Sequence, residues 1–160
     1  MKNEEATVAV NYKSLKISSE AFADNELIPA KFTCEGVNTS PPLNIENIPA
    51  DAKCLVLIVD DPDAPSKTWV HWIVWNIPVT HHLKENGVHG VQGINDSGKN
   101  HYSGPCPPSG THRYFFKVYA LSDLLDLPPT TDKAQLEKVM SEYIIGFGEL
   151  VGLYKRQQPK

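Results

Sequence analysis

Two stretches of the sequence concentrate the residue types that bind or transform small polar molecules. The first reads Asp60-Asp61-Pro62-Asp63-Ala64-Pro65 and is followed by His71; the second reads Gly104-Pro105-Cys106-Pro107-Pro108-Ser109-Gly110-Thr111-His112-Arg113-Tyr114. Carboxylates, imidazoles and a phenol beside stiff proline loops are more than a hydrophobic core requires. We interpret the two stretches as halves of one polar pocket.

The second stretch supplies an imidazole and a phenol to one side of a predicted strand. His112 and Tyr114 alternate with Arg113, so the first two share a face and the guanidinium lies on the other. Taken alone, a His-x-Tyr pair is more often a hydrogen-bonded core histidine beside a core tyrosine. The proline loop before it, with Gly104 and Gly110, is typical of an anion-cradling loop in which backbone N–H groups converge.

The first stretch places aspartates at the end of a buried strand. Asp61 and Asp63 follow that strand directly, and Pro62 and Pro65 stiffen the chain around them. Asp-Pro is also ordinary turn chemistry. Aspartates this close repel one another unless each is paired, and His71 and Arg113 are the expected partners. An aspartate beside a histidine fixes its tautomer and favours the charged imidazole, which can then donate to an anion.

Other chemistry has weaker support. The sequence has no Gly-x-Ser-x-Gly elbow and no phosphate-binding P-loop. His81 and His82 are adjacent, and adjacent histidines rarely chelate one metal ion, so we expect neither a metal nor a cofactor. Cys106 has no evident base and is expected to be structural. We therefore assign no catalytic residue. An alternative is a phosphoester hydrolase or phosphotransferase that uses Asp61 and His112 as base and acid.

Length and composition predict one domain over residues 1–160, with 1–14 as a loosely held lead-in. The net charge of −4, without a basic cluster, argues against nucleic acid as a partner. No apolar run approaches the ~18 residues of a membrane span, and the N-terminus does not resemble a secretory signal. Three cysteines without a CxxC pair are expected to be free thiols in a reducing compartment. These features together predict a cytoplasmic protein.

The hydrophobic pattern predicts a mainly β fold with one late helix. Strong strands are expected at 54–59, 69–77, 113–121 and 147–154, and weaker ones at 15–22, 28–34 and 43–48. Period-2 alternation in the second of these puts His71, Ile73 and Trp75 on one face. A helix is expected to begin at Asp132 with a capping box and to end before Gly146. A single helical turn is expected at 122–126. Residues 79–111 form a long, poorly periodic segment, and loops of this length within a compact domain are usually functional.

The two motifs, in this order and at this separation, resemble the phosphatidylethanolamine-binding protein family, and most closely its microbial, Raf-kinase-inhibitor-like branch. Supporting matches are Asn38-Thr39-Ser40-Pro41-Pro42-Leu43, Asn95-Asp96 and Glu149-Leu150-Val151-Gly152, so the resemblance covers about 17–156. It implies a large antiparallel sheet, a smaller second sheet and an anion pocket at one end. By position, the pocket is lined by Asp61, His71, His112 and Tyr114, with a wall made by Pro107 and Pro108. Asp63, Pro65, Gly104 and Arg113 support it. A cis Ala64–Pro65 bond suits the tight turn.

The combined expectation is a non-enzymatic binding protein whose pocket accepts a phosphate-like or phosphoethanolamine-like group. The resemblance also implies that a protein kinase or serine protease is a partner to consider, as inhibitor or signalling modulator. Contact with a lipid head group and a homodimer are compatible with it. An alternative is a scaffold that works through residues 79–111. Two departures from the family pattern stand out, Ser97 in place of an aromatic residue and Tyr143-Ile144-Ile145 near the C-terminus.

Overall fold

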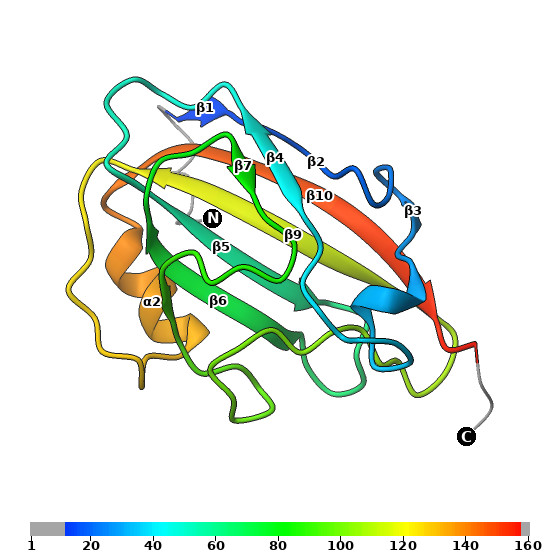
Figure 1. Cartoon of the computed structure of the whole chain (residues 1–160). Coiled ribbons are helices and arrows are strands. Elements are labelled where there is room, and N and C mark those ends of the chain that lie inside the picture. The colour runs from blue at the N-terminus through cyan, green and yellow to red at the C-terminus, as the bar shows by residue number, and fades with distance from the viewer. Residues whose placement is uncertain (1–11, 158–160) are drawn as a thin grey trace.

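The structure, a computed structural model, describes residues 12–157 and is built on two β-sheets (Figure 1). The larger sheet has the strand order β1 (Lys13–Ser14), β10 (Ile144–Lys155), β9 (Thr111–Leu121), β5 (Cys54–Asp61), β6 (Trp69–Ile77) and β8 (Val91–Gln92), and β3 (Glu26–Leu27) also pairs with β10. The smaller sheet has the order β2 (Lys16–Ser18), β4 (Leu43–Glu46) and β7 (His82–Leu83). A 3₁₀ helix, η1 (Ala30–Phe32), and an α-helix, α2 (Lys133–Met140), complete the described elements.

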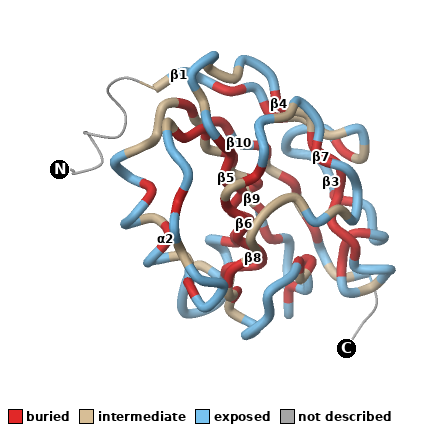
Figure 2. The backbone as a smooth tube through the Cα atoms, turned by 60° about the vertical axis from the view of Figure 1, so that its left-hand side comes forward, coloured by how far each residue is buried: buried red, intermediate tan, exposed pale blue. Residues whose placement is uncertain are grey.

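The large sheet is the middle of three layers. One of its faces packs against the small sheet, where Ile17, Leu43, Ile45 and Leu83 join one apolar cluster with Leu57 and Phe116. The opposite face packs against α2, where Leu136 and Met140 meet a second cluster that includes Val56 and Trp75. Figures 1 and 2 show the helix and the small sheet on opposite sides of the long strands, which form the buried centre.

Strand β5 runs through this centre. All of its eight residues are buried, because a strand covered on both faces needs apolar side chains in both directions. β6 pairs with one edge of β5 and β9 with the other, both antiparallel. Consequently the end of β5, the start of β6 and the start of β9 lie at the same end of the sheet. These are the three places where the sequence carries its polar motifs.

The predicted mainly β architecture, with two sheets and one late helix, is confirmed. The large sheet is mixed, however, because β1 and β3 pair with β10 in parallel. The four long strands are antiparallel, as expected. The capping box of α2 is also confirmed: the Asp132 side chain accepts from the backbone of Gln135, and the Gln135 side chain accepts from the backbone of Asp132.

Several local predictions were wrong. Residues 28–34 form η1 and its flanking loop, because Pro29 leads into a short turn that the backbone amides of Phe32 and Thr33 close. Helix α2 ends at Met140, and Gly146 lies within β10. Residues 122–126 form no helical turn. The Ala64–Pro65 bond is trans, since the described residues contain no cis peptide. Residues 1–11 of the expected lead-in lie outside the described residues.

A β-bulge changes the face on which His71 lies. Val59 pairs with Trp72 whereas Asp60 pairs with Val70, so His71 is an extra residue in β6. Such a bulge reverses the alternation on one side of it. His71 therefore contacts Tyr114 on the small-sheet side of the large sheet. Ile73 and Trp75 lie on the helix side, so the expectation that the three share a face was wrong for His71.

Candidate ligand pocket

A pocket of about 460 Å³ opens at the end of the large sheet where β5 ends and β6 and β9 begin. It contains every residue predicted to line the site. The lining residues come from these strand ends, from the segment after η1 and from the 95–110 loop: Cys34, Asn38, Asp61, Ala64, Pro65, Trp69, His71, Ser97, Ser103, Gly104, Cys106, Pro107, Pro108, His112 and Tyr114. None of them is a lysine or an arginine.

Asp61 and His112 form a buried pair in this pocket. Nδ1 of His112 donates to Oδ2 of Asp61 over 2.6 Å, and both side chains are less than a tenth exposed. The other carboxylate oxygen, Oδ1, accepts from the backbone amide of Asp63 at 2.7 Å. The Asp63 amide therefore holds the carboxylate of Asp61, and the carboxylate holds the imidazole in one orientation. Nε2 of His112 has no protein partner among the described residues.

His71 is fixed in a similar way by a different acceptor. Its Nδ1 donates to the carbonyl oxygen of Ser103 over 2.6 Å. Because a carbonyl only accepts, the hydrogen of the neutral ring lies on Nδ1, and Nε2 keeps a lone pair. Burial lowers the pKa of His71 despite that hydrogen bond and the Asp61 carboxylate. The expectation that His71 is the partner of an aspartate was wrong; His112 is the partner of Asp61.

Tyr114 lies between the two histidines. Its ring contacts that of His71 edge-on at 5.3 Å between centroids and is stacked near that of His112 at 6.4 Å. Tyr114 is almost completely buried, and this burial, together with the carboxylates of Asp61 and Asp63, raises its pKa. The phenol therefore stays protonated at neutral pH and is available as a hydrogen-bond donor.

Asp63 braces the turn that carries Asp61. Its two oxygens accept from Nε, Nη2 and the backbone amide of Arg113, each at 2.9 Å. These contacts lower the pKa of Asp63 to about 2. Arg113 itself lies outside the pocket. Asp60 pairs with Lys117 and Lys133 on the opposite face of the sheet. Each aspartate of the motif therefore has a partner, which is either a group of opposite charge or an imidazole.

The 103–110 loop provides shape more than amide donors. The backbone amides of Ser103 and Gly104 are already used, since they donate to the His71 carbonyl and to Oδ1 of Asn38. Pro105, Pro107 and Pro108 have no N–H. The expectation of converging amides therefore fails for this part of the loop. Gly104 is required by close approach, because a Cβ there would lie 2.3 Å from the Phe32 carbonyl oxygen.

Two asparagines that support the pocket were missed as site residues. Asn95 is buried, and its Nδ2 donates to the carbonyls of His71 and His101 and to Oγ of Ser103. Asn38 lines the pocket and anchors Gly104. Both lie in motifs that the resemblance contains, but only the folded loop shows that they position His71 and the proline segment.

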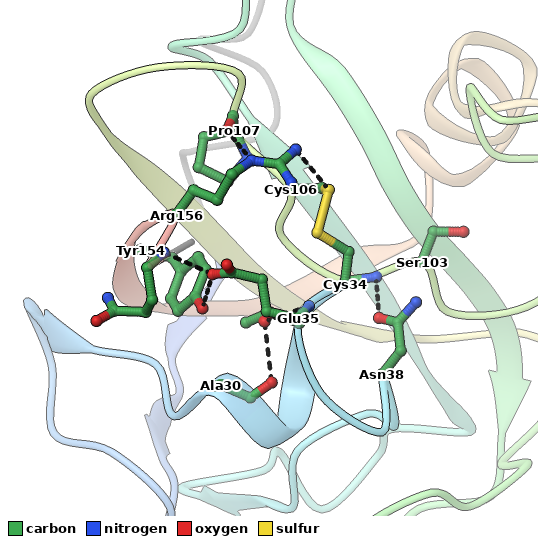
Figure 3. The surroundings of a disulfide bond; sticks show 12 residues. Ala30, Cys34, Glu35, Asn38, Ser103, Cys106, Pro107, Tyr154 and Arg156 are labelled. Carbon is green, nitrogen blue, oxygen red and sulfur yellow. Dashed lines mark hydrogen bonds between the residues drawn. A yellow bond between two sulfur atoms is a disulfide. The ribbon is translucent and has the colours of Figure 1, made fainter. Parts of the chain in front are cut away.

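Cys34 and Cys106 form a disulfide that joins positions 72 residues apart. The expectation of three free thiols was therefore wrong, and only Cys54 is a free, buried cysteine among the described residues. This removes one ground for expecting a cytoplasmic protein. Figure 3 shows Glu35, Tyr154 and Arg156 gathered around the disulfide. Arg156 donates to the Pro107 carbonyl and to Sγ of Cys106, so the end of β10 is tied to the pocket loop.

The two departures from the family pattern have different positions. Ser97 lines the pocket, where an aromatic residue would narrow it. Tyr143 and Ile144 pack against the α2 side of the sheet, and Ile144 pairs with Leu121 at the far end of β9 from His112. The described residues contain no cluster of His, Cys, Asp and Glu able to hold a metal ion. They also contain no helix long and apolar enough to cross a membrane.

The fold and the pocket match one protein family. A sequence profile described as phosphatidylethanolamine-binding protein matches residues 18–155, and the chain belongs to the phosphatidylethanolamine-binding protein family. Within it, the chain falls in the microbial UPF0098 branch. A UPF0098 protein of Pyrococcus horikoshii is 51% identical over 155 residues, 90% of this chain and 78% of the relative. One of Methanothermobacter thermautotrophicus is 47% identical over 150 residues, 89% of this chain and 99% of the relative.

Two solved structures support the same assignment. A putative phosphatidylethanolamine-binding protein homologue of Chlamydia trachomatis superimposes with a TM-score of 0.87 at 41% identity, covering 90% of this chain and 99% of that one. YbcL of E. coli, described as a member of the mammalian family, superimposes with a TM-score of 0.83 at 30% identity, covering 89% and 99%. These identities show that the chain shares both ancestry and fold with them.

Proposed function

We propose that this chain is a non-enzymatic binding protein whose pocket takes a small phosphomonoester, with phosphoethanolamine as a representative ligand. The observation that carries the proposal is the pair of imidazoles whose Nδ1 atoms are both occupied. Their Nε2 atoms are the groups left for a ligand. A phosphate has several oxygens that accept hydrogen bonds, and the Tyr114 hydroxyl adds a third donor beside them.

The charge of the pocket sets how such a ligand binds. No lysine or arginine lines it, and two neutral imidazoles would present only acceptors to a phosphate that is itself an acceptor. Binding therefore requires that at least one Nε2 carries a proton. Asp61 accepts from Nδ1 of His112, so a proton that is taken up with the ligand at Nε2 of this ring lies beside an opposite charge. The ligand should thus bind with proton uptake and with modest affinity.

Two features support binding rather than turnover. An activated nucleophile normally lies within hydrogen-bond reach of its base, and among the described residues no hydroxyl or thiol bonds to His71 or His112. Cys106, the cysteine considered above as a nucleophile, is held in the disulfide. The rival hydrolase would use Asp61 and His112 on a water molecule. Hydrolysis of p-nitrophenyl phosphate that disappears in Asp61→Asn would favour that rival.

The scaffold alternative concerns the 79–111 loop. Part of that loop lines the pocket through Ser97, Ser103 and Gly104, so deleting the loop would destroy the pocket as well. The exposed Val88 at 77% exposure is a better target. If Val88→Asp abolishes capture of a partner while phosphoethanolamine still binds, the loop acts as an independent surface.

Isothermal titration calorimetry with O-phosphoethanolamine tests the proposal. The wild type should bind, and His112→Ala should weaken binding by at least about tenfold, because a charge-assisted hydrogen bond is lost. Phosphotyrosine and phosphoserine peptides as competitors would show whether a kinase or another phosphorylated protein offers the same group. Unchanged binding in His112→Ala would remove this residue from the site and contradict the proposal.

A further inference from the structure

The disulfide occupies an unusual place, because both of its cysteines line the ligand pocket. Both Cys34 and Cys106 are also exposed residues, so the disulfide lies at the surface of the protein. The third cysteine differs in both respects. Cys54 is buried, and burial raises the pKa of its thiol to about 11. Thiol chemistry on the folded protein is therefore directed to the pocket.

The two sides of the disulfide are anchored very differently. Three hydrogen bonds join the segment after η1 to residues 102–105, which lead into Cys106. The Cys34 amide donates to the Pro105 carbonyl, the Tyr102 hydroxyl donates to the Phe32 carbonyl, and the Gly104 amide donates to Oδ1 of Asn38. On the other side, Arg156 makes the hydrogen bonds that join residues 106–110 to the rest of the described chain, and the disulfide and the packing of the buried Pro107 add to them. Breaking the disulfide would thus loosen the wall that Pro107 and Pro108 form.

Arg156 makes the two sulfurs unequal in exchange chemistry. Its Nη2 lies 3.2 Å from Sγ of Cys106, where a guanidinium stabilises a thiolate. The sulfur that leaves more easily in thiol–disulfide exchange is the one with the more stable thiolate. An incoming thiolate should therefore attack Sγ of Cys34 and expel Cys106. Figure 3 shows the guanidinium placed directly beside the Cys106 sulfur.

We propose that Cys34–Cys106 is a reversible redox site that controls the affinity of the pocket. A dithiol attacks Cys34 as a thiolate, forms a mixed disulfide there and releases Cys106 as a thiolate. The second thiol of the same dithiol then attacks the dithiol sulfur that is bound to Cys34. This closes the disulfide of the dithiol and releases Cys34. Two electrons and two protons pass to the protein, the dithiol becomes a disulfide, and an oxidant that accepts two electrons from the two cysteines reverses the change.

The consequence for binding rests on the proposed function. In the oxidised protein the 106–110 segment is held in its binding geometry; in the reduced protein the ligand must order it. Ordering a released loop lowers affinity, so reduction should weaken binding of O-phosphoethanolamine by roughly tenfold. In a reducing compartment, a disulfide that persists only transiently is typical of redox sensing.

The first test compares the affinity for O-phosphoethanolamine before reduction with dithiothreitol, after it, and after reoxidation. We expect a roughly tenfold loss that reoxidation reverses. The Cys34→Ser/Cys106→Ser double variant should bind like the reduced wild type with or without reductant. Equal affinities in the two states, with only the melting temperature changed, would show a structural staple and overturn the proposal.

The second test needs no phosphorylated ligand. Brief exposure to glutathione, followed by alkylation and mass spectrometry, should place the mixed disulfide on Cys34, and Arg156→Gln should slow its formation several-fold. Lys155→Gln is the matched control, because it removes a neighbouring charge that the structure does not place on the sulfur. Equal rates in both variants, or a mixed disulfide on Cys106, would contradict the proposed chemistry. If oxidised wild type fails to bind O-phosphoethanolamine, the proposed function fails while this test still decides the redox site.

Discussion

Asp61 and His112 are 51 residues apart in sequence, and their side chains meet in a 2.6 Å hydrogen bond at the base of the pocket. This contact requires β5 and β9 to be neighbours in the sheet, since the first ends at Asp61 and the second begins one residue before His112. The hydrogen bond that orients the His112 imidazole therefore depends on the order of the strands in the sheet.

Replacing Asp61 with Asn should weaken O-phosphoethanolamine binding at about pH 6 by roughly tenfold. The amide is isosteric, and its oxygen still accepts from the Asp63 amide. Its NH₂ group then faces Nδ1 of His112, which places the ring hydrogen on Nε2. This neutral N–H can still donate to the phosphate, but the hydrogen bond is no longer charge-assisted and is therefore weaker. Calorimetry measures the affinity. Asp63→Asn, an equal charge change outside the pocket, serves as control and should cost much less; equal losses would argue for a general charge effect.

Binding should become tighter as the pH falls from about 8 to 5.5, since binding of the phosphate is coupled to the uptake of a proton. Burial lowers the pKa of His71, so this histidine is neutral in the free protein at neutral pH. Calorimetry in buffers of different ionisation enthalpy should detect an uptake of about one proton for each ligand bound. Affinity that is flat over this range, with no proton uptake, would contradict the mechanism.

The same shift predicts how stability depends on pH without a ligand. Because the folded pKa of His71 is below its ordinary value, the unfolded chain binds the proton more readily. The contribution of His71 to stability is complete above about pH 6.5 and is lost as the pH falls below it. Urea denaturation of wild type and His71→Asn over this range should show a smaller pH dependence in the variant. Identical slopes would exclude His71 as the source.

Removing the Arg113 brace should affect stability only slightly. The pair with Asp63 is substantially exposed, and exposed ion pairs contribute little to stability because solvent screens them. The Asp63 pKa near 2 means that its contribution is present above its ordinary pKa and is lost as the pH falls toward about 2. Arg113→Met should therefore weaken ligand binding more clearly than it lowers the melting temperature. Glu137→Gln, on the distant helix, is the control and should leave binding unchanged.

Loss of the disulfide should lower the free energy of unfolding by roughly 2–4 kcal/mol, because the cross-link restricts a long loop of the unfolded chain. Cys34→Ser/Cys106→Ser can be compared with the oxidised wild type by urea denaturation. Cys54 provides an internal check. Its thiol should react with iodoacetamide only when the protein unfolds, since it is buried. No difference in unfolding midpoint would indicate that the disulfide is absent from the purified protein.

The sequence predicted the parts of the fold that depend on local pattern. β5 is apolar on both faces, β9 and β6 are rich in aromatic and β-branched residues, and Asp132 with Gln135 forms the expected cap. Short elements were less predictable. β1 and β3 have only two residues each, and they form strands because they pair with β10. This pairing depends on the tertiary structure and cannot be predicted from a short stretch of sequence.

The pocket residues were predicted by type, but several of their relationships were not. The face of His71 depends on a bulge in the register between β5 and β6, and register is invisible in a single strand's alternation. The partner of Asp61 depends on which neighbour β5 pairs with. The disulfide joins cysteines 72 positions apart, and their proximity follows only from the packing of η1 against the 103–110 loop.

The most direct test of the central claim is a crystal structure of the oxidised protein soaked with O-phosphoethanolamine. We expect a phosphate whose oxygens lie within hydrogen-bond distance of Nε2 of both His71 and His112, with the Tyr114 hydroxyl beside it. A phosphate bound elsewhere at saturating concentration, with both Nε2 atoms facing only water, would contradict it.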